Sequence, residues 1–205
     1  MITDRLRSLA REALHVSERI LHPWRRRAAL RRLERAPRPR TLLFVCHANI
    51  CRSPYAAAAA RRWLPLPSVT VMSAGFVGPD KRSPAEAVAI AAERGLDLAT
   101  HRAQVIDMAQ LRAADLVIVM DRQQRRRLVS GRPALRHRVE LLGDLDPEPI
   151  TRRAVLDPFR QPADVFRECY DRIDRCVAAL ARSCGDLPGA DADLRPDRSR
   201  VSRAP

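Results

Sequence analysis

FVCHANICRSP, residues 44–54, joins a strand pattern to a helix pattern. Before it, RTLLFVC at 40–46 is a short apolar run typical of a buried strand. After it, SPYAAAAARRWL at 53–64 predicts a helix, with Ser53 placed to cap the N-terminus and Pro54 at the first position. The loop therefore enters a helix N-terminus, where unpaired N–H groups and the helix dipole favour an anion.

The same strand and helix patterns recur along the chain. A second pair is predicted at 68–75 and 83–95, and its helix begins with a capping box from Ser83 to Glu86 and closes at Gly95. The remaining predicted elements are a strand at 114–120, a basic helix at 122–130, a strand at 137–144 and an amphipathic helix at 163–183. Strands that alternate with helices form parallel sheets covered on both faces. We therefore expect an α/β fold of three layers, with a four-stranded parallel sheet between helices.

Residues 1–40 differ in composition from the rest of the chain and contain twelve arginines and four acidic residues. Apolar residues recur at helical spacing, which predicts a helix over 3–35 with a break at Pro23. This apolar stripe consists of Leu6, Leu9, Ala13, Val16 and Ile20. A linker is predicted at 36–40. We expect this basic helical extension to precede a single domain at 41–184 and a disordered tail at 185–205.

The overall composition narrows the class of protein. The formal net charge is +14, but Lys81 is the only lysine, and so extreme an arginine excess is more typical of codon bias in a high-GC genome than of a nucleic-acid-binding surface. No apolar run approaches the roughly 20 residues that span a bilayer, and no signal-peptide pattern is present. We expect a cytoplasmic protein that does not bind nucleic acid.

The five cysteines do not have the pattern of a disulfide framework or of a zinc site. Their number is odd and no secretory signal precedes them. Cys46, His47 and Cys51 lack a second ligand cluster that would complete a tetrahedral zinc site. We expect no metal and no other cofactor. The other cysteines are predicted to be small apolar residues of the last helix; they are Cys169, Cys176 and Cys184.

The loop contains a cysteine and an arginine at a spacing that suits phosphate binding. Arg52 follows Cys46 by six positions and can close the loop with a planar fork that matches two phosphate oxygens. The positive field of the helix N-terminus and of Arg52 favours the thiolate, which is the nucleophilic form of cysteine. The Cys-x5-Arg spacing resembles the signature of cysteine-dependent phosphatases.

The stretch VCHANICRSP resembles the phosphate loop of the low-molecular-weight protein tyrosine phosphatase family, whose usual form is V-C-x-G-N-I-C-R-S-P. It departs at Ala48, where the family commonly has glycine. The resemblance runs from about Thr41 to Arg182. It includes SAG at 73–75, His101, MD at 120–121, ELLGDLDP at 140–147 and DPF at 157–159.

The resemblance implies a two-step hydrolysis of phosphate esters. The Cys46 thiolate attacks phosphorus while a protonated Asp157 delivers a proton to the leaving group; water then hydrolyses the phosphocysteine with Asp157 as base. Arg52 and the loop amides hold the phosphoryl oxygens. His101 is expected to support Asn49, which fixes the loop. The residues implied in phosphate and substrate binding are His47, Ala48, Asn49, Ile50, Cys51, Ser53 and Phe159.

Two Asp-Pro pairs compete for the role of general acid. Asp157 stands in DPF just before the last helix, where the family has its Asp-Pro-aromatic motif. Asp146 belongs to LLGDLDP, lacks a following aromatic residue and fits a turn. We therefore expect Asp157 to be the acid. Cys51 is expected to protect Cys46 from over-oxidation through a reversible disulfide.

Alternative functions remain open from the sequence. Arginine phosphatases of the same family have threonine where this chain has Ile50, and related arsenate reductases need cysteines in the middle of the chain, where none occurs between Cys51 and Cys169. Bacterial relatives commonly act on tyrosine kinases that control polysaccharide export, so such a kinase is an expected partner.

The extension at 1–38 lies outside the resemblance. Its apolar stripe could pack on the domain or on a second copy in a homodimer. Alternatively, it could dock on an acidic partner or on the inner membrane surface, which would make the protein a docking protein with secondary catalysis.

Overall fold

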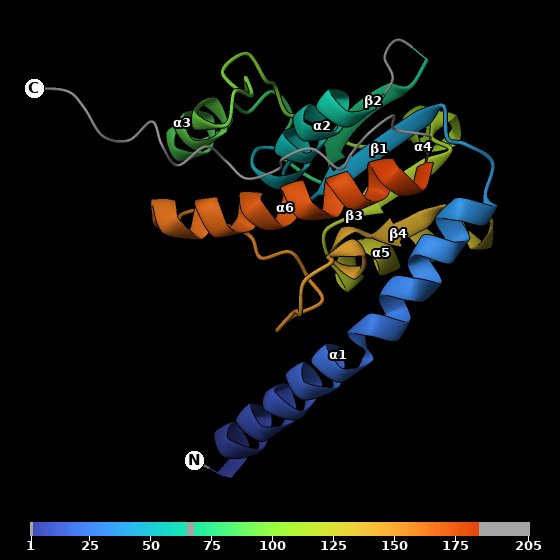
Figure 1. Ribbon diagram of the computed structural model, residues 1–205. Coiled ribbons are helices and arrows are strands. Elements are labelled where there is room, and N and C mark those ends of the chain that lie inside the picture. The colour runs from blue at the N-terminus through green and yellow to red at the C-terminus, as the bar shows by residue number, and fades with distance from the viewer. Residues whose placement is uncertain (1, 65–67, 185–205) are drawn as a thin grey trace, which may run out of the picture.

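The computed structural model describes residues 2–64 and 68–184, with side chains from His15 onward (Figure 1). The tail predicted at 185–205 lies outside these residues. The elements, in chain order, are α1 (Ile2–Arg35), β1 (Thr41–Cys46), α2 (Arg52–Trp63), β2 (Thr70–Gly75), α3 (Ala85–Glu93), α4 (Met108–Ala113), β3 (Leu116–Val119), α5 (Arg122–Val129), the 3-10 turn η1 (Pro133–Leu135), β4 (Val139–Leu141), the 3-10 turn η2 (Leu142–Leu145) and α6 (Ala163–Cys184).

The four strands form one parallel sheet in the order β2-β1-β3-β4. Alternate residues of β1 face opposite sides: Phe44 belongs to the core beneath α2 and α6, while Val45 belongs to the core beneath α4 and α5. The predicted three-layer α/β fold is confirmed. The register pairs Cys46 with Gly75, so the loop after β1 lies beside the end of β2 at the carboxyl edge of the sheet.

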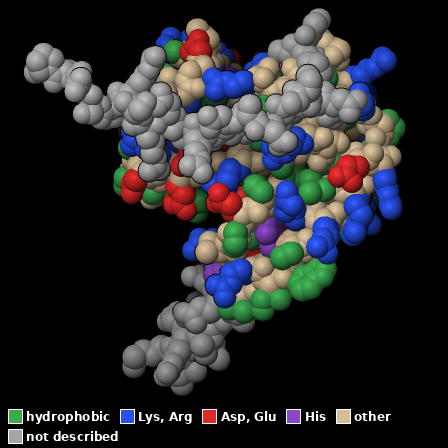
Figure 2. Space-filling model, viewed as in Figure 1, with side chains coloured by type: hydrophobic (Ala, Val, Ile, Leu, Met, Phe, Trp, Pro, Cys, Tyr) green, Lys and Arg blue, Asp and Glu red, His purple; other side chains and the backbone are tan. Residues whose placement is uncertain are grey.

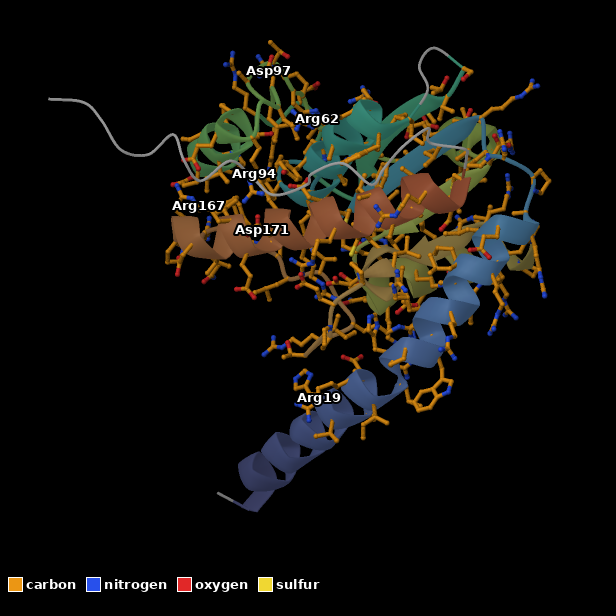
Figure 3. All side chains as sticks on the ribbon, in the orientation of Figure 1. Arg19, Arg62, Arg94, Asp97, Arg167 and Asp171 are labelled. Carbon is orange, nitrogen blue, oxygen red and sulfur yellow. The ribbon has the colours of Figure 1, made fainter. Side chains whose placement is uncertain are left out.

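Ion pairs join the end of α3 to α6 in the helix layer on one face of the sheet. Figure 3 shows Arg94, just after α3, beside Asp171 of α6, and Nη1 of Arg94 lies 2.7 Å from Oδ1 of Asp171. Arg167 of α6 also pairs with Glu93 at 2.8 Å. These pairs are largely exposed, so we attribute most of the stability of this layer to its apolar core.

Helix α1 continues through Pro23, and the predicted break there is wrong. Tertiary contacts lie on both sides of the proline, because Nε2 of His22 lies 2.9 Å from the carbonyl oxygen of Asp146, and Arg26 donates to Leu145 O at 3.4 Å. These contacts offset the hydrogen bond that proline removes from the helix.

The predicted apolar stripe of α1 does not pack on the domain where it is described. Val16 and Ile20 are 51% and 56% exposed, whereas Ala29 and Leu33 are buried in the domain core. The side chains of Leu6, Leu9 and Ala13 lie outside the described part of the chain. Figure 1 shows the N-terminal part of α1 running away from the sheet. In the described residues, no helix combines the length and the apolar character needed to cross a membrane.

Two predicted helix caps are wrong. The hydroxyl of Ser53 contacts Cys46 and Ala74 inside the loop and does not cap α2, which begins after Cys51 without a side-chain cap. Helix α3 begins after Pro84, so Ser83 stands one position too early to cap it. The short helix α4 was not predicted, although Asp107 and Gln110 form a capping box at its start.

Candidate active site

Asn49 determines the shape of the loop between β1 and α2. Its φ is 53°, a left-handed conformation that asparagine tolerates better than most residues. Its Nδ2 donates to the hydroxyls of Ser53 at 2.8 Å and Ser73 at 2.9 Å, and its Oδ1 accepts from the amide of Gln104 at 2.9 Å. One buried side chain thus ties the loop to α2, to β2 and to the segment after α3.

Gly75 allows the loop to approach the end of β2. A Cβ atom at Gly75 would lie 2.7 Å from the Asn49 nitrogen and 2.8 Å from the Ala48 carbonyl carbon, closer than such atoms come in proteins. The next residue, Phe76, donates its N–H to His47 O at 2.7 Å. Sequence reasoning quoted Gly75 as part of a motif but did not assign it to the site. The feature of the sequence that could have indicated this role is the glycine at the end of the predicted strand 68–75, which pairs with Cys46 in the structure.

Ala48 fits the loop without backbone strain. The described non-glycine residues with positive φ are Asn49, Asp80 and Arg160, so Ala48 keeps a conformation that alanine adopts readily. The alanine at this position therefore does not require a left-handed backbone.

Cys46 lies at the floor of a pocket and is almost fully buried. Ser53 Oγ is 3.1 Å from Cys46 Sγ and 3.2 Å from Ala74 O. Because Asn49 already donates to the Ser53 oxygen, the hydroxyl hydrogen is free to point at either acceptor. A thiolate at Cys46 would attract that hydrogen, so Ser53 is placed to stabilise a negative charge on this sulfur.

Arg52 reaches from the start of α2 to the loop that contains the second Asp-Pro pair. It is 4% exposed, and its Nη1 donates to Val155 O at 3.1 Å. Its Nη2 makes a very short ion pair with Asp157 Oδ2. Its Nε is buried and has no hydrogen-bond partner. An unpaired donor on a buried cation is costly, and an anion in the pocket would satisfy it.

The two candidate acids occupy different environments. The Asp157 side chain is 44% exposed, and Asp157 lines the pocket together with Cys46 and Arg52. Asp146 is 1% exposed, lies outside that pocket and is held by Arg172 at 3.0 Å and Arg175 at 3.2 Å. The structure therefore brings Asp157, and not Asp146, to the cysteine loop.

His101 contacts the loop through the backbone of Asn49. Its Nε2 lies 2.7 Å from Asn49 O, and since a carbonyl only accepts, Nε2 carries the hydrogen. Burial lowers the pKa of His101 below its usual value, and the charge of nearby Arg61 lowers it further.

Burial raises the pKa of the Cys51 thiol well above its usual value. Cys51 is thus a protonated thiol near neutral pH.

The pocket has a volume of about 470 Å³ and is lined by three segments of the chain. The cysteine loop forms the floor, Asp157 and Phe159 form one side, and the segment from Val77 to Pro84 forms the other. Exposed Val77 and Phe159 give the walls an apolar character, and Lys81 and Arg82 add positive charge. Among the described residues, no group of three or more His, Cys, Asp or Glu side chains could hold a metal ion.

Cys46, Arg52 and Asp157 all lie in the part of the chain that matches one family profile. The profile described as "Low molecular weight phosphotyrosine protein phosphatase" matches residues 41–187. The chain belongs to this family. The match begins at β1, so α1 lies outside the matched residues.

Relatives and solved structures agree with the family assignment. The "Probable low molecular weight protein-tyrosine-phosphatase EpsP" of Ralstonia nicotianae is 39% identical over 142 residues, which are 68% of this chain and 92% of that protein. The crystal structure of tyrosine phosphatase Wzb from Escherichia coli K30 in complex with sulphate aligns with a TM-score of 0.65 at 28% identity, covering 72% of this chain and 99% of that one. The YwlE arginine phosphatase from Geobacillus stearothermophilus aligns with a TM-score of 0.63 at 28% identity, covering 70% and 92%.

Proposed function

We propose that this protein hydrolyses phosphotyrosine in proteins, with Cys46 as nucleophile, Arg52 as phosphate clamp and Asp157 as general acid and base. The observation that carries the proposal is the buried, unpartnered Nε of Arg52, a residue that lines the same pocket as Cys46. The N-terminus of α2 has no side-chain cap, so its amides are available to the same anion. We infer that residues 41–184 form the catalytic unit, and the family match at 41–187 supports this.

The geometry fits two successive displacements at phosphorus. Cys46 attacks in line while Arg52 and the loop amides hold the remaining oxygens. A phosphoryl group competes with Asp157 for the guanidinium of Arg52, and so releases the Asp157 carboxyl to face the leaving group. That carboxyl then protonates the leaving phenolate, and afterwards activates the water that cleaves the phosphocysteine.

Pocket chemistry supports an aryl phosphate over a phosphoarginine. Ile50 lines the pocket, and the exposed side chains of Val77 and Phe159 offer apolar surface to a phenol ring. The guanidinium of Arg160 lies 5.3 Å from the Phe159 ring centre, so a positively charged substrate group would meet a like charge at this wall. A bacterial tyrosine kinase that carries phosphotyrosine is the partner we infer.

The test compares peptides that carry phosphotyrosine, phosphoserine or phosphoarginine. Wild type should release phosphate from phosphotyrosine. Cys46→Ser should be inactive, and Asp157→Ala should be slower by roughly a hundredfold or more, as expected for loss of a general acid. Wild type without phosphotyrosine activity would refute the proposal, and a preference for phosphoarginine would replace it with the arginine phosphatase function.

We also infer that α1 docks on anionic lipid, which would place the enzyme at the inner membrane surface. Val16, Ile20 and Trp24 are spaced by four residues, so they share one side of the helix, and Trp24 is 61% exposed. Arg27 and Arg31 continue that side and are exposed. Figure 2 shows hydrophobic and basic side chains together on α1, and Figure 3 labels Arg19 on the part of α1 that projects from the domain. This combination fits a negatively charged interface.

Vesicle sedimentation tests this second proposal. Wild type should pellet with vesicles that contain phosphatidylserine, and less with pure phosphatidylcholine. The double variant Ile20→Ser, Trp24→Ser should lose the difference, and Glu34→Ala, an exposed change on the same helix, should keep it. A concentration-dependent dimer that the double variant abolishes would instead assign the surface to a second copy, although like charges would then meet across the interface.

A further inference from the structure

Helix α1 contacts the loop that presents Asp157. The carboxylate of Glu18 accepts the backbone N–H of Arg153 at 2.9 Å, and Glu18 is buried. Arg153 lies four residues before Asp157 in the chain. A helix outside the family match therefore satisfies a backbone donor in the loop that ends at the general acid.

The same loop is held on its other sides by the domain. Arg172 of α6 donates to the carbonyls of Arg152 and Ala154, each at 2.8 Å. The side chain of Arg153 forms a bidentate pair with buried Asp144 of η2, with both distances at 2.5 Å. Val155 donates its N–H to Met120 O at 2.9 Å. Glu18 adds a hydrogen bond to this loop from a helix outside the family match.

The part of α1 around Glu18 is itself fixed to the domain. His22, one turn further along, contacts Asp146 O at 2.9 Å, and Arg26 donates to Leu145 O. Both acceptors belong to the chain at or next to η2, on which the loop rests closely: a Cβ atom on Gly143 would lie 2.0 Å from Arg153 O. Glu18 therefore holds the loop from an anchored position.

The loop leads directly into the reacting groups. Val155 O accepts from Arg52 Nη1 at 3.1 Å, and Asp157 pairs with Nη2 of the same guanidinium. A shift at Arg153 would pass through two peptide units to Val155 and then to the acid. Small displacements of a catalytic group reduce rates strongly because proton transfer needs close, aligned donor and acceptor atoms.

We propose that Glu18 is a positioning residue for the general acid, so that the N-terminal helix of this chain sets the efficiency of leaving-group protonation. This inference rests on the proposed function of Asp157. It gives α1 a role in catalysis as well as in docking, and it makes the acid loop responsive to anything that moves α1.

The test uses the full chain and two aryl phosphates that differ in leaving group. Phenyl phosphate releases phenolate, a strong base close to tyrosine with a pKa of about 10, and depends on the acid. p-Nitrophenyl phosphate releases a much weaker base and depends on it less. Glu18→Ala should lower kcat/KM, which reports the step that releases the leaving group, by roughly tenfold for phenyl phosphate and by clearly less for p-nitrophenyl phosphate. Glu18→Gln keeps an acceptor oxygen and should restore most of the loss.

A double-variant cycle separates positioning from general damage. In the Asp157→Ala background, Glu18→Ala should have almost no further effect, because the acid that Glu18 positions is gone. Glu34→Ala, on the exposed side of α1, is the matched control and should behave like wild type. If Glu18→Ala fails to fold, Glu18→Asp, which shortens the reach by one methylene, takes its place with the same expected pattern.

Several results would overturn the inference. They are an equal loss with both leaving groups, an undiminished loss in the Asp157→Ala background, or wild-type rates in the folded variant. Wild type that cleaves neither aryl phosphate would instead refute the proposed function, so the two failures are distinguishable.

Discussion

Nε2 of His101 donates a hydrogen bond to the carbonyl oxygen of Asn49 at 2.7 Å, and thus supports the backbone of the residue that shapes the phosphate loop. Burial lowers the pKa of His101 below its usual value of 6.5, so the unfolded chain binds a proton more readily than the folded one. The stabilisation from the neutral imidazole is therefore complete above about pH 6.5 and is lost as pH falls through the folded-state pKa.

We expect the free energy of unfolding of wild type to fall more between about pH 7.5 and about pH 5.5 than that of His101→Gln. Glutamine can still donate to Asn49 O but does not titrate. Urea unfolding at both pH values measures the difference. Identical pH dependence in the two proteins would show that His101 titration contributes nothing to this part of the stability curve.

Gly75→Ala should disrupt the loop, because the new Cβ would collide with the backbone of Ala48 and Asn49. We expect a loss of about 1–3 kcal/mol in stability and a fall of roughly a hundredfold in kcat/KM. Gly131→Ala is the control: nothing lies within 4 Å of its Cβ position, although its positive φ of 69° is unfavourable for alanine. It should lose some stability and keep its activity. Equal activity of both variants would contradict the close approach.

Asp146→Asn should lower the stability of the protein, whereas Asp157→Asn should lower its activity. The first removes the buried charge that pairs with Arg172 and Arg175, and should lower the free energy of unfolding by about 3 kcal/mol. The second should leave stability nearly intact and lower kcat by roughly a hundredfold or more. Urea unfolding and phosphotyrosine turnover measure the two effects. Activity that depended on Asp146 as strongly as on Asp157 would contradict the assignment of the acid.

Positive charge on the pocket wall should favour acidic substrates. Exposed Lys81 and Arg82 line the pocket beside Val77, so phosphotyrosine peptides with flanking Asp or Glu should bind better than peptides with flanking Lys. Lys81→Ala, Arg82→Ala should raise KM for acidic peptides by about threefold to tenfold, while kcat changes little. Added salt should erase the difference. No change in KM would mean that these side chains do not contact the substrate.

Most of the fold could be predicted from local sequence patterns. The strands and the longer helices of the domain each show the hydrophobic periodicity of their type, and the strands lie close to their predicted ranges. The misses arose where tertiary contacts overrode local preference. Ser53 has the residue type of a helix cap but bonds within the loop, and α1 passes Pro23 because His22 and Arg26 hold it to the domain. Glu18 escaped sequence reasoning entirely, because its partner is a backbone amide 135 positions away.

Cys51 should protect the active site from oxidation, although it is a poor nucleophile at rest. Burial holds its pKa well above the usual value, so peroxide should react first at Cys46 and form a sulfenic acid there. The Cys51 thiol can then condense with that sulfenic acid, which releases water and leaves a disulfide that added thiol reduces. Without Cys51, the sulfenic acid persists and oxidises further to forms that thiols do not reduce.

Wild type treated with peroxide should therefore regain most of its activity with dithiothreitol, and Cys51→Ser should regain much less. Cys184→Ser, at the far end of α6, is the control and should recover like wild type. Full recovery of Cys51→Ser would show that the second cysteine of the loop has no protective role.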